Sequence, residues 1–269
     1  MMRAKLSIEN LSKTFSSDEG PLEVIKNVSL DLMSEEFVSL LGPSGCGKST
    51  LLRIIGGLDE PTEGSVRLDG AVVKGPGRER GMVFQSYTSF PWLTVRENVE
   101  FALYPASMPA AERRELARHY VALVGLSPFE NYLPRKLSGG MQQRVAIARA
   151  LAAEPTVLLF DEPFGALDAQ TRSLMQEELQ KFLRQTEERT TLFVTHDVEE
   201  AVFLADRIIL FSSRPATILE EVQITGREIQ GQKIATANLR NPEFKSSPAF
   251  VELRRQIDPL IRRELTFTS

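Results

Sequence analysis

The sequence predicts an α/β fold whose core is a mainly parallel β-sheet, and two patterns in the 269 residues predict it. Three apolar runs of strand length are separated by helical stretches, which is the order typical of βαβ units. A further apolar run leads through a glycine-rich loop into a segment of good helix formers. The three runs span residues 157–160, 192–194 and 208–211, the strand before the loop spans 37–41, and 218–224 is a candidate for one more strand.

The other segments have patterns of their own. The first forty residues alternate in strand fashion around a turn at 16–21, and 65–70 and 81–85 have the pattern of short strands. Between about residues 95 and 151, Ala, Glu, Arg and Leu predominate with helical spacing, and prolines at 128 and 134 divide this region. In the tail, residues 250–265 place their apolar side chains on one helical face.

Composition narrows the class of protein. The net charge of −4 argues weakly against a nucleic-acid partner, because a phosphate backbone favours a basic surface. No apolar run approaches the roughly 18 residues of a membrane span, and the N-terminus lacks a signal-peptide pattern. Cys46 is the only cysteine, which excludes an intrachain disulfide, and with two histidines it makes a structural zinc site improbable. We expect a protein of the cytoplasm or of the inner face of a membrane.

A phosphate-binding loop follows the strand at 37–41. Residues 42–50 satisfy the pattern G-x-x-x-x-G-K-[ST] in the strand–loop–helix context that the motif needs. Glycines let successive backbone N–H groups point at phosphate oxygens, and the helix N-terminus adds partial positive charge. Lys48 can reach the β- and γ-phosphates, and the Ser49 hydroxyl can bind Mg²⁺. The loop predicts a nucleoside triphosphate site made of Gly42, Pro43, Ser44, Gly45, Cys46, Gly47, Lys48, Ser49 and Thr50.

Two acidic residues end the apolar strand at 157–160. In phosphate-loop nucleotide hydrolases an aspartate at such a strand end holds Mg²⁺, which is the role expected for Asp161. The adjacent Glu162 can polarise the attacking water as a general base. The alternative is a pair of solvated acids at a strand end, but the nearby phosphate loop favours the catalytic interpretation.

A second glycine turn precedes the helical run at 145–151. Ser138, Gly139 and Gly140 open this helix and form another possible phosphate cradle. One nucleotide does not need two cradles. We therefore expect this one to serve the nucleotide of a second copy of the protein.

With these motifs the chain resembles the ATP-binding cassette (ABC) ATPases over roughly residues 4–225. Residues 137–142 are similar to the family signature, with methionine at 141 where glutamine is commonest. Gln85 resembles the Q-loop glutamine, a lever between Mg²⁺ and the transport subunit, and residues 165–168 resemble the D-loop that touches the opposite protomer. His196 resembles the switch histidine that contacts the γ-phosphate, and Phe15 stands where an aromatic ring stacks on adenine.

The resemblance implies a fold of three parts and a reaction shared by two copies. The parts are a phosphate-loop ATPase core with an antiparallel β subdomain (1–86 and 152–225), an inserted α-helical signature subdomain (87–151), and a C-terminal extension with a terminal helix (226–269). A homodimer would sandwich two ATP molecules, with water attacking the γ-phosphorus in line. The implied residues are Lys48, Gln85, Glu162 and His196 for catalysis; Ser49, Gln85 and Asp161 for Mg²⁺; and Phe15, residues 42–50, Ser138, Gly139, Gly140 and Asp168 for ATP.

Three other residues have simpler interpretations. His119 lies on a charged helix and is expected to be a solvated surface residue, and Cys46 is expected to be a small filler. Glu35 stands where family members usually carry glycine, so it would be slightly strained if its turn needs a positive φ.

Three classes of ABC protein compete: the ATPase of an importer, the ATPase of an exporter, and a soluble member acting in DNA repair, translation or iron–sulfur assembly. The chain has one cassette and no long coiled-coil insertion, which weakens the soluble class. Residues 85–95, 204–207 and 213–215 and the short tail helix are similar to the nitrate/sulfonate/taurine importer ATPases. This resemblance implies a cytoplasmic subunit at the inner membrane, bound to transmembrane permease subunits and served indirectly by a periplasmic or lipoprotein solute-binding protein. The sequence does not identify the solute, and no nucleic-acid partner is expected.

An aromatic cluster beside the catalytic glutamine agrees with an importer subunit. Tyr87, Phe90, Pro91 and Trp92 follow Gln85 within a few residues. Exposed apolar patches often mark protein interfaces, so a coupling helix of a membrane subunit could dock here. The alternative is that these rings pack inside the domain, as aromatic residues often do.

Overall fold

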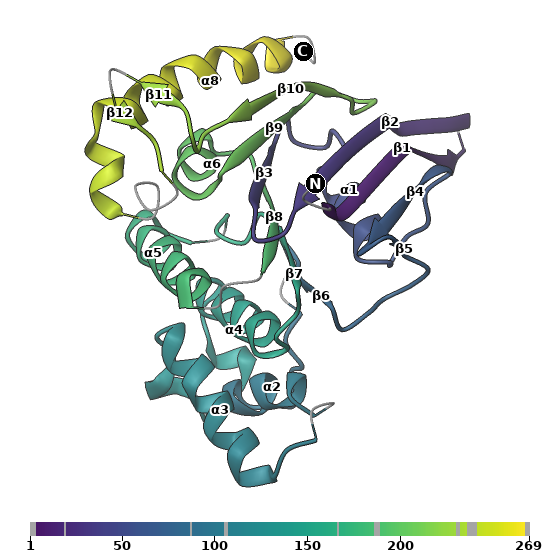
Figure 1. The fold of residues 1–269 in the computed structure, drawn as a ribbon. Helices are drawn as coiled ribbons and strands as arrows, with labels where there is room; N and C mark the ends of the chain where they lie inside the picture. Colours follow the sequence, from purple (N-terminus) through teal and green to yellow (C-terminus); the bar gives the residue numbers. More distant parts are fainter. Residues whose placement is uncertain are drawn as a thin grey trace. The chain divides into compact units, whose positions relative to one another are not determined.

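The computed structural model describes residues 4–18, 20–86, 88–104, 107–165, 167–185, 189–229, 232–235 and 241–266 (Figure 1). The chain forms two compact units, one made of Met1–Gly77 with Thr186–Ser269 and the other of Arg78–Gln185. Each unit has its own strands and helices. No helix among the described residues combines the length and the apolar character that a membrane span needs.

An antiparallel sheet in the order β2-β1-β4-β5 forms one part of the first unit. Its strands are β1 (Ala4–Ser17), β2 (Gly20–Met33), β4 (Glu63–Leu68) and β5 (Ala71–Val72). The two long strands pair as a hairpin, in which Leu6 lies opposite Leu32 and Phe15 lies opposite Leu22. Alternate apolar residues of this sheet are buried, as the strand pattern of the first forty residues predicts.

A parallel sheet forms the other part of the first unit. β3 (Phe37–Leu41) lies between β8 (Thr190–Thr195) and β9 (Arg207–Phe211), and β10 (Ile218–Gln223) pairs with β9 in the antiparallel sense. Every residue of β3 and of β8 is buried, which explains why these strands are continuous apolar or small-residue runs.

The α-helices described in the first unit are α1 (Lys48–Ile55), α6 (Val198–Leu204) and α8 (Pro248–Thr266). α6 packs on β3 and β8, and α8 packs on α6. The connection to α8 contains β11 (Glu228–Ile229), β12 (Gln232–Lys233) and the short helix η3 (Pro242–Ser246). The predicted apolar face of the tail is buried in this packing at Phe250, Leu253, Ile257 and Ile261.

The second unit is mainly helical. Its two strands, β6 (Arg80–Val83) and β7 (Val157–Asp161), pair in parallel. Between them α2 (Val95–Ala102), α3 (Ala110–Leu123) and α4 (Gly139–Ala152) pack together, and α4 also packs on β6. Prolines 128 and 134 lie in the first turns of the short helices η1 (Ser127–Phe129) and η2 (Pro134–Lys136), where a missing N–H costs little. α5 (Ala169–Gln185) follows β7.

The structure confirms the predicted fold class. It has mainly parallel strands around β3, an antiparallel sheet built on β1 and β2, and helices inserted between β6 and β7. The predicted domain boundaries stay predictions. Glu35 has a φ of 66°, so the strain anticipated in its turn is present.

Candidate functional site

The phosphate-binding loop joins β3 to α1 with the backbone that its glycines permit. Gly47 has a φ of 128° and immediately precedes α1, where no side chain caps the described N-terminal turn and no acidic residue lies in it. The first N–H groups of α1 are therefore available to an anion. Gly42 is needed for close packing, because a Cβ there would lie 3.0 Å from Cβ and 3.1 Å from the carbonyl oxygen of Phe211.

Lys48 is buried within its own loop. Its Nζ donates hydrogen bonds to the carbonyl oxygens of Gly42 and Pro43, at 2.8 and 2.7 Å. Carbonyl groups satisfy the ammonium without neutralising it, so an incoming phosphate oxygen is a stronger acceptor. Burial raises the pKa of the neighbouring Cys46 thiol, which keeps it protonated and agrees with its interpretation as a small filler.

His196 lies at the same end of the sheet as the phosphate-binding loop. Leu41 of β3 is paired with Thr195 of β8, so Gly42 and His196 each follow directly at the carboxyl ends of neighbouring parallel strands. This edge is where open α/β sheets bind ligands. The His196 side chain is exposed, and its C-terminal neighbour Asp197 donates its N–H to Thr195 Oγ1 at 3.0 Å, which fixes the backbone around it.

Phe15 is an exposed ring near the end of β1. The Lys13 ammonium lies 4.8 Å from the centroid of this ring and donates to the carbonyl oxygen of Glu60 at 2.7 Å. A cation over one face restrains the ring and leaves another face for a planar ligand. The side chain is 37% exposed, as a stacking platform requires.

In the second unit, Gln85 and Asp161 share an edge of the β6–β7 pair. Val83 is paired with Phe160, so Asp161 and Gln85 follow these partners by one and two residues. Asp161 is buried, whereas Gln85 is exposed. The carboxylate of Asp161 and the amide oxygen of Gln85 are hard oxygen ligands of the kind that Mg²⁺ prefers, and the hydroxyl of Ser49, in the first unit, has the same chemical character.

Glu162 has a left-handed backbone with a φ of 45°. Such strain in a residue that is not glycine is typical of functional sites, where it aims a side chain. Its Oε2 lies 4.0 Å from the position that a Cβ on Gly165 would occupy, which is an ordinary van der Waals distance.

The signature residues form the N-terminus of α4. Ser138 caps this helix by accepting a hydrogen bond from Met141 N–H at 3.3 Å. The side chain of Ser138 is exposed, and α4 has no acidic residue in its first turn. The positive end of α4 therefore faces solvent and can bind an anion.

α4 also holds the segment that contains Gln85. The buried side chain of Gln143 donates to the carbonyl oxygen of Phe84 at 3.2 Å, and Arg149 donates to the carbonyl oxygen of Thr88. The two carbonyl groups that α4 contacts lie before and after Gln85 in the sequence. Sequence reasoning did not find them, because a side chain reaching a distant carbonyl leaves no local pattern.

Asp168 caps α5 rather than standing free. Its Oδ1 accepts a hydrogen bond from Thr171 N–H at 3.0 Å, which lowers the pKa of the Asp168 carboxyl. The side chain is exposed and can be reached by another molecule. Ala166, within the same predicted D-loop, lies outside the described residues.

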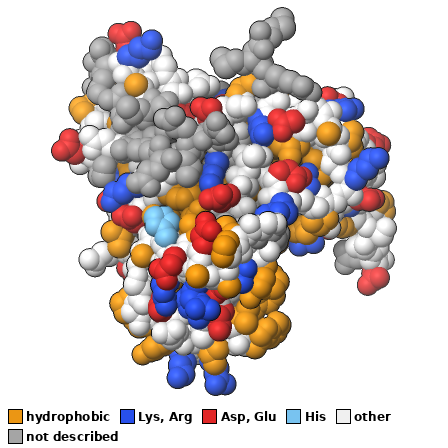
Figure 2. Space-filling view, turned by 60° about the horizontal axis from the view of Figure 1, so that its bottom comes forward, with side chains coloured by type: hydrophobic (Ala, Val, Ile, Leu, Met, Phe, Trp, Pro, Cys, Tyr) orange, Lys and Arg blue, Asp and Glu red, His pale blue; other side chains and the backbone are white. Residues whose placement is uncertain are grey.

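Phe90, Trp92, Phe101 and Tyr104 form a continuous aromatic surface, and Figure 2 shows hydrophobic side chains gathered over this helical part of the second unit. Ring centroids are 5.5 Å apart for Phe90 and Trp92, 4.7 Å for Phe90 and Phe101, and 6.0 Å for Phe101 and Tyr104. Trp92 is 71% exposed, so the alternative of a buried ring is wrong for this residue. Tyr87 lies outside the described residues. The sequence analysis missed Phe101 and Tyr104, although both belong to or follow α2 at helical spacing.

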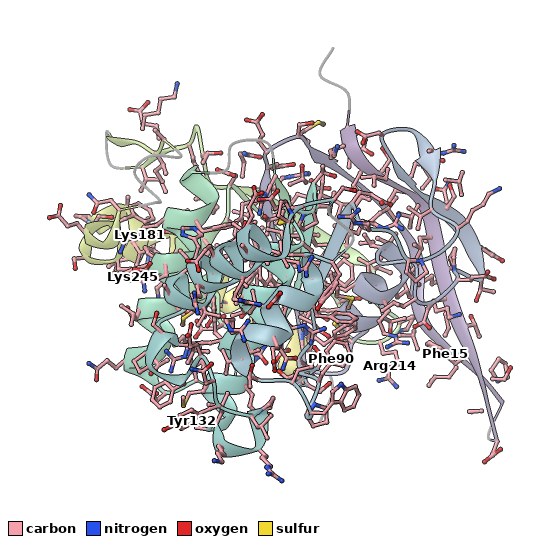
Figure 3. The ribbon with its side chains drawn as sticks, turned by 90° about the horizontal axis from the view of Figure 1, so that it is seen from below. Phe15, Phe90, Tyr132, Lys181, Arg214 and Lys245 are labelled. Carbon is pink, nitrogen blue, oxygen red and sulfur yellow. The ribbon has the colours of Figure 1, made fainter. Side chains whose placement is uncertain are left out.

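The predicted site residues therefore form two groups. Phe15, the phosphate-binding loop and His196 belong to the first unit, and Gln85, Asp161, Glu162, Ser138 and Asp168 belong to the second. The sequence analysis also missed Arg214 as a contact of the loop; its guanidinium donates to the carbonyl oxygen of Gly45 (Figure 3).

Comparison with known proteins agrees with this arrangement. The family model described as "ABC transporter" matches residues 25–165. The nitrate import ATP-binding protein NrtD of Synechocystis sp. is 48% identical over 257 residues, covering 96% of this chain and 95% of that protein. The aliphatic sulfonates import ATP-binding protein SsuB of Bacillus thuringiensis is 42% identical over 252 residues, covering 94% of each.

A solved structure adds a fold comparison with a bound product. A dimeric, post-hydrolysis state of an ATP-binding cassette bound to ADP and Pi superposes with a TM-score of 0.75 at 38% identity, covering 82% of this chain and all of that chain. The predicted resemblance to the ABC ATPases and to the nitrate and sulfonate importer ATPases is confirmed. The chain belongs to the ABC transporter family as an ATP-binding subunit, and it is an ATPase.

Proposed function

We propose that this chain is the ATP-hydrolysing subunit of an importer for a small solute such as nitrate, a sulfonate or taurine. Its similarity to the nitrate and sulfonate import proteins extends over at least 94% of the chain in each case, which supports an importer over an exporter or a soluble member. In this proposal the subunit lies at the cytoplasmic face of the membrane, bound to transmembrane permease subunits. A solute-binding protein delivers the solute on the other side.

ATP binding begins at the phosphate-binding loop. Residues 42–50 wrap the phosphates, and Lys48 exchanges its bonds to Gly42 and Pro43 for the β- and γ-phosphates. Phe15 stacks on adenine. Ser49, Gln85 and Asp161 would hold Mg²⁺, which neutralises phosphate charge when bound.

Hydrolysis needs one base and several positive groups. Glu162 takes a proton from water as the water oxygen bonds to the γ-phosphorus and the bond to the bridging oxygen breaks. His196 contacts the γ-phosphate. Ser138, Gly139 and Gly140 of a second copy close the site with the N-terminus of α4, and Asp168 lies at the contact between copies. The dimeric state of the cassette bound to ADP and Pi supports a homodimer here.

The aromatic surface is the observation that carries the link to transport. It begins five residues after Gln85, and α4 brackets the intervening segment through Gln143 and Arg149. Arg149 stacks 4.7 Å from the centroid of Phe90, so it contacts both this segment and the surface. A permease helix pressing on the aromatic surface would thereby act on Gln85 and on the signature helix.

The first test replaces the most exposed ring of this surface. Aromatic anchors at interfaces often cost about 2 kcal/mol when truncated, so Trp92→Ala should weaken permease binding roughly thirtyfold. ATP affinity and the Tm of the isolated subunit should stay close to those of the unmodified chain. Tyr132→Ala is the matched control, because Tyr132 is 45% exposed in the same unit but does not belong to the aromatic surface. Co-purification with the permease measures both variants.

Two outcomes of that test contradict the proposal. A sharp fall in Tm for Trp92→Ala alone would make the ring part of the core, and equal permease binding by both variants would remove the surface from the interface. The direction of transport needs a second experiment, in proteoliposomes containing the neighbouring permease and solute-binding protein. ATP-dependent accumulation of nitrate or taurine is expected, whereas efflux would show an exporter.

A further inference from the structure

We propose that Arg214 is a positioning residue for the phosphate-binding loop, and that Glu264 of the C-terminal helix α8 sets ATP affinity through it. The proposal gives the C-terminal extension a regulatory role in nucleotide binding. It rests on the ATP-binding activity of the family and is independent of the transported solute. All the residues involved belong to the first unit.

Arg214 donates two hydrogen bonds to a single carbonyl group of the loop. It lies in the turn between β9 and β10, and its Nη2 and Nε donate to the carbonyl oxygen of Gly45 at 2.6 and 3.2 Å. In the described part of the chain its guanidinium forms no ion pair, so its positive charge stays beside the loop. Hydrogen bonds from a charged donor are among the stronger ones in proteins.

The carbonyl group that Arg214 holds controls a peptide plane of the phosphate cradle. Gly45 has a φ of 74°, and the N–H of the next residue, Cys46, donates to the carbonyl oxygen of Pro43 at 3.4 Å. Because a peptide group is planar, fixing the Gly45 carbonyl also fixes the direction of the Cys46 N–H. Without Arg214 the described hydrogen bond that still holds this peptide is the 3.4 Å bond from Cys46 N–H to Pro43, so the cradle loses part of its preorganisation for phosphate.

The turn that carries Arg214 is itself fixed to the hairpin strand beside the loop. Ala216 N–H donates to the carbonyl oxygen of Val24 at 2.8 Å, and Lys26 N–H donates to the carbonyl oxygen of Ala216 at 3.0 Å. β2 reaches the loop at this point, since a Cβ on Gly47 would lie 3.0 Å from Val24 Cγ1. The turn and the loop therefore share one rigid support.

The third attachment of the turn comes from α8. Glu264 Oε2 accepts hydrogen bonds from the N–H and the hydroxyl of Ser213, at 2.9 and 3.0 Å. Ser213 immediately precedes Arg214. The same helix is anchored by Leu253 and Ile257, which are fully buried. A displacement of the end of α8 would release Ser213, loosen the turn and withdraw the support of Arg214 from Gly45.

The test measures ADP binding by calorimetry on the isolated full-length chain, because ADP is not hydrolysed. Arg214→Ala should raise the Kd for ADP about tenfold, the effect of losing a charged hydrogen bond, and Arg214→Lys should restore part of the affinity. Glu264→Ala should raise the Kd about threefold, since its effect is indirect. In ATPase assays the KM should rise in the same order, with kcat at saturating ATP within about twofold of the unmodified chain.

Glu252→Ala is the matched control for the tail. Glu252 lies in α8 but accepts its hydrogen bonds from Arg255 and Gln256 of the same helix, so its loss should leave ADP affinity unchanged. Tm values accompany every Kd, and Arg214→Lys and Glu264→Gln serve if an alanine variant unfolds. Unchanged ADP affinity in folded Arg214→Ala would overturn the positioning role. Equal affinities for folded Glu264→Ala and Glu252→Ala would overturn control by α8.

Discussion

At the scale of single residues, the left-handed backbones of Glu162 and Glu35 have different consequences. Glu162 has a φ of 45° at the end of β7, beside Gly165, and Glu35 has a φ of 66° in the turn after β2. For an L-residue this conformation costs roughly 1–2 kcal/mol. At Glu162 the strain directs the proposed general base, whereas at Glu35 the exposed side chain has no role in the site. Strain at Glu35 is therefore removable.

Glu35→Gly should stabilise the chain. Glycine adopts a positive φ without strain but loses more entropy on folding, so we expect a net gain of about 0.5–1 kcal/mol in the free energy of unfolding. The hydrogen bond from residue 35 N–H to Thr190 Oγ1, at 3.1 Å, involves only the backbone and is retained. Urea unfolding measures the change, with Glu60→Gly as the control at an exposed glutamate that has no positive φ. A loss of stability in both variants would contradict the strain argument.

At the scale of elements, the strands of the parallel sheet were the most predictable parts. The predicted strands match β3, β7, β8 and β9 within two residues at each end. They were predictable because a strand buried on both faces has a continuous run of apolar residues in its sequence. The phosphate-binding loop and the signature turn were equally clear, since each needs glycine or a cap at fixed positions.

Contacts between elements were not predictable in this way. Two side chains of α4 donate to the backbone carbonyl groups of Phe84 and Thr88, which lie 59 and 61 residues away in the sequence. Arg214 donates to the carbonyl group of Gly45, 169 residues away. Any residue supplies a carbonyl oxygen, so the acceptor leaves no sequence signal. The aromatic surface was half predicted, because Phe90 and Trp92 are close in sequence while Phe101 and Tyr104 join them only through α2.

The α4 N-terminus supplies the prediction at this scale. Ser138→Arg should abolish ATP hydrolysis by blocking the anion site, while the ATP affinity of the isolated monomer stays nearly intact, because the proposal assigns this site to the nucleotide of a second copy. Ser127→Arg, at an exposed serine in η1 of the same unit, is the control and should remain active.

Mixing the Ser138→Arg and Lys48→Ala proteins should leave at most one competent site per heterodimer. If Ser138→Arg lowered the ATP affinity of the monomer as much as Lys48→Ala does, the phosphate-binding loop and the signature turn would bind the same nucleotide, which contradicts the proposal.

At the scale of the whole molecule, the chemistry is divided between the two units. In our proposal the first unit contributes the phosphate-binding loop and His196, and the second contributes Gln85, Asp161, Glu162 and the signature turn. In our proposal a complete site also needs the signature turn of a second copy. Each copy then binds ATP at its own phosphate-binding loop, the bound ATP stabilises the dimer, and hydrolysis removes that stabilisation.

The most direct test of this account is the oligomeric state of Glu162→Gln in the presence of Mg²⁺ and ATP. The substitution keeps the shape of the side chain but removes the base, so ATP should bind without being hydrolysed. Size-exclusion chromatography with light scattering should then show a stable dimer containing two ATP molecules, whereas the unmodified chain should elute mainly as a monomer. Adding Lys48→Ala to Glu162→Gln should abolish the dimer. A Glu162→Gln protein that stays monomeric, or that hydrolyses ATP at the rate of the unmodified chain, would contradict the account.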